Sequence, residues 1–197
     1  MKNFLFSLIT VLLMVGMVTG ATTAYFSDTE TSTGNTFAAG TLDLNLDGGN
    51  TNVVKFTVSN MKPGDSQTGT WRVSNVGSIA GYLDLQNITQ THSAGTSTEP
   101  ELAVENPDLG TLGSLLNIDL FIDTDNDGVL DSGETTIYSG LMGSLATDYN
   151  QNLSLVAGAT NYITMIVSWP SSANDNKGQG DTAQLDITFE LGQTAGQ

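Results

Sequence analysis

Apolar and polar residues alternate through most of the chain after residue 40. In residues 41–46 the leucines share one face and the polar side chains the other, which is the pattern of a half-buried β-strand. Residues 182–191 alternate in the same way, and residues 161–169 form the most hydrophobic segment, which we expect at the centre of a sheet. Further strands are predicted at residues 53–58, 70–76, 80–88, 117–122 and 135–138.

Turn-forming runs separate these segments, and no periodic pattern predicts a long helix among them. The pattern therefore predicts an all-β domain over residues 41–197, a two-sheet antiparallel sandwich that is either jelly-roll-like or immunoglobulin-like. Residues 89–113 lack alternation and contain Pro100 and Pro107, so they predict a long surface excursion, in which residues 100–104 can form a helical turn.

The first 24 residues predict a signal peptide. Residues 4–18 are almost continuously apolar, which is too short to span a bilayer comfortably but suits a signal-peptide core. Small residues precede Tyr25, which would become the first residue of the mature chain. A retained N-terminal anchor is the other reading. Either one places the protein outside the cytoplasm, and the signal peptide predicts a secreted protein that meets the membrane only during export.

Residues 25–40 form a polar, Thr-rich arm between the leader and the first strand of the sandwich. The arm has β-propensity but little to bury, so it is a candidate for pairing with the exposed sheet edge of another molecule. It can equally be a disordered tail or an edge strand of its own sheet. The candidate donor-strand residues are Tyr25, Phe26, Ser27, Asp28, Thr29, Thr31, Thr33, Thr36 and Phe37.

The chain is strongly acidic. It has 21 acidic and five basic residues and a net charge of −16, which becomes −17 when Lys2 leaves with the leader. Such a surface repels nucleic acid and attracts cations, so we expect no nucleic-acid partner. Cysteine is absent, which excludes disulfides and cysteine-ligated zinc.

Residues 123–134 match the twelve-residue calcium-loop template, with Gly128 at the position of the sharp turn. Strands rather than helices are predicted on both sides, so the loop predicts a structural calcium clip rather than a sensor. A solvated acidic turn without an ion is the alternative. The predicted Ca²⁺ ligands are Asp123, Asp125, Asp127, the carbonyl of Val129, Asp131 and Glu134.

Other candidate sites carry weaker signals. His92 is the single histidine, and neither an H-E-x-x-H nor a G-x-S-x-G motif occurs, so we predict no enzymatic activity. Asn87 and Asn152 begin N-glycosylation sequons, which chance also produces in so Asn- and Thr-rich a chain. Trp71, Tyr82 and Trp169 belong either to the core or to a sugar-binding face.

Several blocks occur in an order typical of a known family. Ala24-Tyr25-Phe26-Ser27-Asp28 is followed by residues 35–44, then by Met61-Lys62-Pro63-Gly64-Asp65-Ser66, by Asn75-Val76-Gly77-Ser78, and by residues 178–190. These blocks resemble the TasA/camelysin family of biofilm-matrix fibre proteins. The chain is also similar to archaeal bundling pilins, which its low lysine content and acidic loop suit.

The resemblance implies a jelly-roll subunit that polymerises by donor-strand complementation, in which the arm of one subunit completes a sheet of the next. The expected partner is therefore the protein itself, as a head-to-tail filament with lateral bundling in a biofilm matrix. A monomeric secreted adhesin or glycan-binding module is the main alternative, and a secreted peptidase is a third. Some family members carry a metallopeptidase label, which the residues of this chain do not support chemically.

Overall fold

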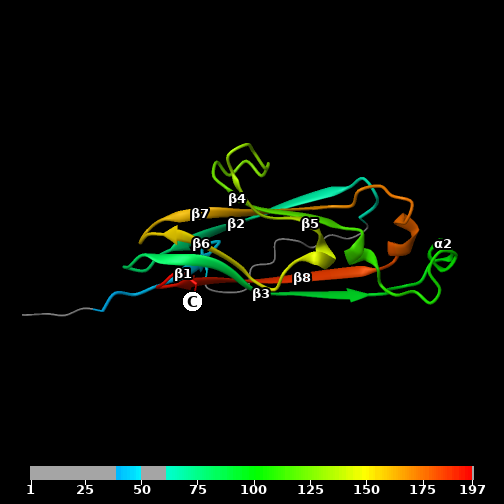
Figure 1. Cartoon of the computed structure of the whole chain (residues 1–197), viewed down its shortest axis with the longest axis horizontal. Helices are drawn as coiled ribbons and strands as arrows, with labels where there is room; N and C mark the ends of the chain where they lie inside the picture. The colour runs from blue at the N-terminus through cyan, green and yellow to red at the C-terminus, as the bar shows by residue number, and fades with distance from the viewer. Residues whose placement is uncertain (1–38, 50–60, 197) are drawn as a thin grey trace, which may run out of the picture. The chain divides into compact units, whose positions relative to one another are not determined.

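The computed structural model describes residues 39–49 and 61–196, which form two antiparallel β-sheets packed face to face (Figure 1). The strand order is β1-β2-β7-β4-β5 in the five-stranded sheet and β6-β3-β8 in the three-stranded sheet. The predicted all-β, two-sheet sandwich is confirmed. The strands are β1 (Leu44–Leu46), β2 (Ser66–Asn75), β3 (Gly81–Ser93), β4 (Asn117–Asp123), β5 (Thr135–Leu141), β6 (Tyr149–Leu155), β7 (Thr160–Ser168) and β8 (Thr182–Gly192).

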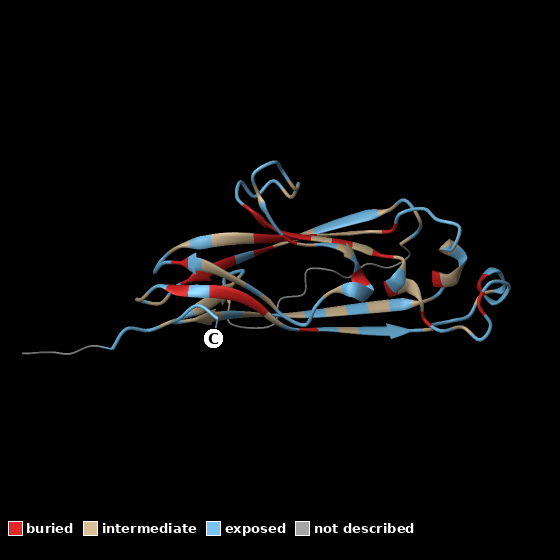
Figure 2. Cartoon of the chain, viewed as in Figure 1, coloured by how far each residue is buried: buried red, intermediate tan, exposed pale blue. Residues whose placement is uncertain are grey.

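The hydrophobic core lies between the two sheets (Figure 2). As predicted, the most hydrophobic segment is central, because β7 lies in the middle of the five-stranded sheet and pairs with both β2 and β4. Trp71 on β2 contacts Phe189 on β8, with ring centroids 5.5 Å apart. This contact joins the two sheets by direct aromatic packing.

Two strands differ from the sequence prediction. The polar residues 89–93 are not part of the loop, because they continue β3 and pair with residues 182–186 of β8. His92 therefore lies on a strand and not in a loop. The edge strand β6 was not predicted, because most of its residues are polar and only Leu155 is fully buried. Main-chain pairing holds residues 89–93 in their sheet, whereas β6 also packs Tyr149, Leu153 and Leu155 against the core at alternate positions.

The excursion between β3 and β4 contains two short helices, α2 (Glu99–Leu102) and η1 (Leu112–Ser114). The helical turn predicted around Pro100 is thus present. Thr98 caps α2, because its hydroxyl accepts from Glu101 N while the Glu101 carboxylate accepts from Thr98 N. Two further 3-10 helices are η2 (Met142–Ser144) and η3 (Asp175–Gly178).

The turn after β2 holds the chain just before β1. Ser78 N and Ile79 N both donate to the carbonyl of Thr41, and Thr41 N donates to Ser78 Oγ. A Cβ atom on Gly77 would lie 2.2 Å from that same carbonyl, so only glycine permits this approach. The sandwich therefore holds Thr41 firmly, one residue after the end of the predicted arm.

Strand β8 forms one edge of the three-stranded sheet, and in the described part of the chain it pairs only with β3. Its core-facing side chains alternate as predicted but are each only half-buried, whereas Leu83 and Leu85 on the neighbouring β3 are fully buried. The hydrophobic cover is thus incomplete along this edge. The half-buried side chains are Ala183, Leu185, Ile187, Phe189 and Leu191.

The predicted signal peptide, the donor-strand arm up to Ala38 and the strand at residues 53–58 lie outside the described residues. Within the described ranges, no helix is both long and apolar enough to cross a bilayer.

Candidate functional site

The acidic loop connects β4 to β5 and lies on the outer face of the five-stranded sheet, away from the main core (Figure 1). Gly128 of the loop approaches β2, where an added Cβ would lie 3.5 Å from the methyl group of Thr68. Three loop residues have positive φ: Asn126 (60°), Gly128 (79°) and Gly133 (111°). These residue types adopt that conformation most readily, so the sequence favours the tight course of the loop.

Asp123 is the buried anchor of the loop, with 1% of its surface exposed. Its Oδ2 accepts hydrogen bonds from Gly128 N (3.0 Å) and from the hydroxyl of Thr164 (2.7 Å), and its Oδ1 accepts from Asp127 N (3.2 Å). The carboxylate thus ties the first half of the loop to β7. A carboxylate fixed in this way is positioned before any ion arrives.

Thr164 was not singled out in the sequence, although a threonine inside the most hydrophobic strand was the available signal. Its hydroxyl is fully buried and donates to Asp123, so the hydroxyl of Thr70, 2.7 Å away, must donate to Thr164. A series of hydrogen bonds therefore connects Thr70 on β2 through Thr164 on β7 to Asp123 at the end of β4.

The second half of the loop closes through Glu134. Its Oε1 accepts from Thr124 N (2.6 Å) and its Oε2 accepts from Asp131 N (3.1 Å). Val129 N donates to Asp127 Oδ1 (2.8 Å), and the Val129 side chain faces solvent. The carboxylate side chains therefore order the loop backbone themselves.

The structure brings all five predicted carboxylates together in two overlapping groups. In one group, carboxylate oxygens of Asp123, Asp125 and Glu134 lie within 4.8 Å of one another, and in the other those of Asp125, Asp127 and Asp131 do. Asp125 belongs to both groups. An ion bound beside Asp125 would therefore have two further carboxylates of either group near it.

The crowding of negative charge has an electrostatic consequence. Desolvation raises the pKa of Asp125, and the charges of Asp127, Glu134 and Asp123 raise it further, against the opposing effect of a hydrogen bond from Asp127 N. A cation would relieve this repulsion and favour the charged carboxylate. Binding of a cation here would therefore be accompanied by the loss of protons.

The donor set consists of carboxylate oxygens, which suit a hard divalent cation. A catalytic zinc site normally uses histidine ligands and keeps one coordination position for water. The single histidine, His92, is not among the carboxylate groups that the structure gathers in residues 39–49 and 61–196. The observed clusters thus do not fit the zinc centre of a peptidase, although they can hold another metal ion.

The two sequon asparagines occupy unusual backbone positions. Asn87 has φ of 50° and is exposed at a bulge in β3, and Asn152 has φ of 48° on β6. The Asn152 amide nitrogen donates to Asn150 O, whereas no bond is found for the Asn87 side chain. Asparagine tolerates positive φ, so the backbone gives both residues a role that needs no glycan. Glycosylation stays a prediction, with Asn87 the more accessible position.

The aromatic residues do not form a common surface. Trp71 and Trp169 are 6% and 3% exposed and belong to the core, whereas Tyr82 is 36% exposed. The core reading of the two tryptophans is therefore confirmed. A sugar-binding platform made of these three side chains is not present.

Comparison with known proteins places the chain in a family. A search of curated proteins returned no match. The sequence model of the family described as "Camelysin metallo-endopeptidase" matches residues 1–197, which is the whole chain. The resemblance to archaeal bundling pilins stays a prediction, but the resemblance to TasA and camelysin is confirmed: the chain belongs to the camelysin metallo-endopeptidase family.

Proposed function

We propose that this protein is a secreted structural subunit of an extracellular filament, which polymerises head-to-tail by donor-strand complementation. The observation that supports this most directly is the edge of β8. Its core-facing side chains are half-buried, and in the described residues nothing pairs with its outer side. An incoming strand would complete both the hydrogen-bond ladder and the hydrophobic cover.

The arm is long enough to pair along the whole edge of β8. At roughly 3.3 Å per residue, residues 25–38 extend to about 45 Å, while the 11 residues of β8 span about 36 Å. Phe26 and Phe37 would serve as side-chain anchors near the two ends of the arm. Because the arm and the β8 edge are different surfaces, each subunit would donate to one neighbour and accept from another. Such a contact does not close on itself and gives a filament.

The acidic loop would act in this material as a structural calcium clip. With five basic residues against 21 acidic ones, lateral association of filaments requires cations to reduce the repulsion. Four of the five loop carboxylates lie on residues that are exposed or half-exposed. Calcium would therefore order each subunit and also promote bundling in a biofilm matrix.

We infer a structural rather than a catalytic role despite the family description. The carboxylate clusters lack the histidine ligands of a zinc peptidase, as described above. A chelator-sensitive peptidase activity of the pure protein that disappears in Asp125→Asn would overturn this inference. The monomeric glycan-binding alternative has less support, because Trp71 and Trp169 are buried.

Negative-stain microscopy and sedimentation of the purified mature protein test polymerisation. Deletion of residues 25–37 should abolish filaments and leave a folded monomer. On the acceptor side, Leu185→Lys places a charge on the half-buried face of β8 and should block assembly, whereas Gln184→Lys on the exposed face of the same strand should not. Filaments of normal length from the deletion variant would refute the proposal.

A further inference from the structure

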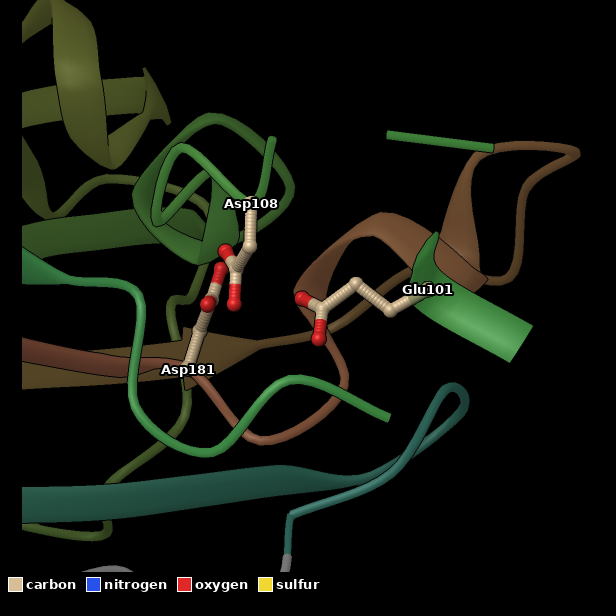
Figure 3. A group of neighbouring side chains, drawn as sticks. All are labelled: Glu101, Asp108 and Asp181. Carbon is tan, nitrogen blue, oxygen red and sulfur yellow. The ribbon is translucent and has the colours of Figure 1, made fainter. Parts of the chain in front are cut away.

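A second acidic cluster lies at the other end of the sandwich from the turn that holds Thr41. It joins Glu101 of α2, Asp108 of the following loop and Asp181, which precedes β8. Carboxylate oxygens of the three residues lie within 4.8 Å of one another. Figure 3 shows the three carboxylates turned toward one another from three separate segments.

This cluster is more buried than the acidic loop, because one of its residues is buried and the other two are only partly exposed. Glu101 is fully buried, with 0% of its surface exposed. Its Oε2 accepts from Thr98 N (3.2 Å), but its Oε1 is buried and has no hydrogen-bond partner. Asp181 repeats this arrangement, because its Oδ2 accepts from Leu112 N (3.0 Å) while its buried Oδ1 has no partner. Both of these unpartnered oxygens are on residues of the cluster.

Asp108 completes the cluster from the excursion. Its Oδ2 accepts from the hydroxyl of Ser97 (2.9 Å), and its Oδ1 accepts from Gly110 N (3.1 Å). These two bonds fix the side chain toward Asp181. Each carboxylate is thus held in place by bonds from the chain around it.

Within the described residues, no salt bridge joins a positive side chain to this cluster. The one ion pair found in the described ranges joins Lys62 to Asp65, far along the sequence from the cluster. A buried carboxylate without a cation or a full set of donors is costly, and an unsatisfied buried oxygen is rare in folded proteins. Desolvation raises the pKa of Asp181, and the charges of Asp108, Glu101 and Glu105 add to that effect.

The surrounding backbone is built for close contact. A Cβ atom on Gly95 would lie 1.8 Å from the carbonyl oxygen of Gly180, and one on Gly180 would lie 2.2 Å from the carbonyl oxygen of Thr96. The hydroxyl of Thr111 also donates to Lys177 O (2.8 Å). The glycines thus let the excursion lie directly against the segment that carries Asp181, which sets the position of the three carboxylates.

We propose that Glu101, Asp108 and Asp181 form a second divalent-cation site, distinct from the acidic loop, that binds Ca²⁺ through Glu101 Oε1, Asp181 Oδ1 and an oxygen of Asp108. Oxygen ligands in this number suit a hard cation, whose remaining coordination positions water or main-chain carbonyls fill. The ion gives both unpartnered oxygens a ligand and offsets the charge of the cluster. It also fastens the excursion to the start of β8.

Equilibrium dialysis against Ca²⁺ alone, on the purified mature protein, tests this site separately from the loop. The double variant Asp125→Asn/Glu134→Gln removes the loop site, and one tightly bound ion per chain should remain. Adding Glu101→Gln or Asp181→Asn to that background should abolish the remaining ion. Adding Glu99→Gln, an exposed acidic residue on the same helix, should leave the remaining ion in place.

Thermal unfolding gives a second readout. At a hundredfold excess of Ca²⁺ over its Kd, the loop double variant should gain roughly 5 to 10 °C in Tm relative to EDTA. Glu101→Gln should remove this gain without lowering the Tm in EDTA, because the amide removes a buried charge. If Glu101→Gln fails to fold, Asp108→Asn at the less buried side of the cluster serves instead.

The proposal is overturned if the double variant binds no Ca²⁺, or if the remaining ion survives Glu101→Gln and Asp181→Asn alike. A proton shared between the carboxylates would then account for the cluster. Filament formation by the triple variant would not bear on this result, so the second site and polymerisation fail independently.

Discussion

The hydroxyl of Thr164 lies 2.7 Å from Oδ2 of Asp123 and connects the acidic loop to the central strand of the larger sheet. Both side chains are buried, and Thr70 extends the chain of hydrogen bonds to β2. Loop order and sheet stability are therefore coupled. An ion bound in the loop should stabilise the sandwich as a whole, and damage to β7 should weaken the ion site.

We predict that Thr164→Val destabilises the protein by about 1 to 3 kcal/mol, because valine keeps the shape but leaves Thr70 and Asp123 without their partner. Calcium affinity of the loop should fall by roughly tenfold or more, as for other residues that orient a ligand. Urea unfolding and calcium titration measure the two effects. Thr188→Val, at an exposed position of β8, is the control and should change neither.

Acidification should release calcium from the loop. The pKa of Asp125 is raised above 3.8 in the ion-free protein, so protons compete with the ion as the pH falls toward that value. In EDTA, where no ion is bound, the stability of the protein depends on pH in the opposite direction. Because the pKa of Asp125 is higher in the folded than in the unfolded protein, the free energy of unfolding falls as the pH rises from 3.8 to the folded pKa.

Asp125→Asn should remove this part of the pH dependence in EDTA, and unfolding curves at pH values above 3.8 test it. With Ca²⁺ present, the same variant should be less stable than the wild type, because it has lost a ligand. Equal stabilities with and without Ca²⁺ in the wild type would count against an ion site in the loop.

Asp65 should behave in the opposite way. Hydrogen bonds from the side chain and the main chain of Lys62 lower the pKa of the Asp65 carboxyl below 3.8. Its stabilising contribution is therefore present above pH 3.8 and is lost as the pH falls through the folded pKa. An NMR titration should show Asp65 ionising at a lower pH than an ordinary aspartate. In Lys62→Met the pKa should move back toward 3.8.

Asn75 should be among the most sensitive positions of the fold. Its buried amide nitrogen donates to Leu155 O (2.9 Å) in the opposite sheet and to Ile79 O (2.8 Å), and its oxygen accepts from Gly77 N (3.0 Å). Asn75→Ala leaves these main-chain groups unpaired and should cost about 2 to 4 kcal/mol. Chemical unfolding of this variant beside Asn174→Ala, an exposed asparagine, gives the comparison.

The sequence predicted those parts of the fold that depend on a repeating pattern. The β7 and β8 strands and the acidic loop follow from alternation and from a twelve-residue spacing, so they were predictable. In β6 the polar residues obscure the alternation of Tyr149, Leu153 and Leu155. The end of β3 depends on main-chain pairing with distant residues, which leaves no local pattern. The same reason applies to Thr164, whose partner Asp123 is 41 positions away.

The cluster of Glu101, Asp108 and Asp181 was the feature least predictable from the sequence. Seventy-three positions separate Asp108 from Asp181, and contacts such as the close approach of Gly95 to Gly180 and the bond from Leu112 N to Asp181 bring the two segments together. In so acidic a chain, no single one of these residues stands out. Their significance depends on burial, which only the folded structure reveals.

The contact between Thr41 and the turn at residues 77–79 determines how any strand leaving the N-terminal side of the sandwich must begin its course. Three hydrogen bonds hold Thr41, so in our proposal one subunit would meet the next at a set angle and not through a loose tether. The mechanical stiffness of a fibre made in this way would then depend on a glycine, Gly77, that contacts no neighbouring subunit in our proposal. Replacing it with alanine would produce fibres that still assemble but bend more easily.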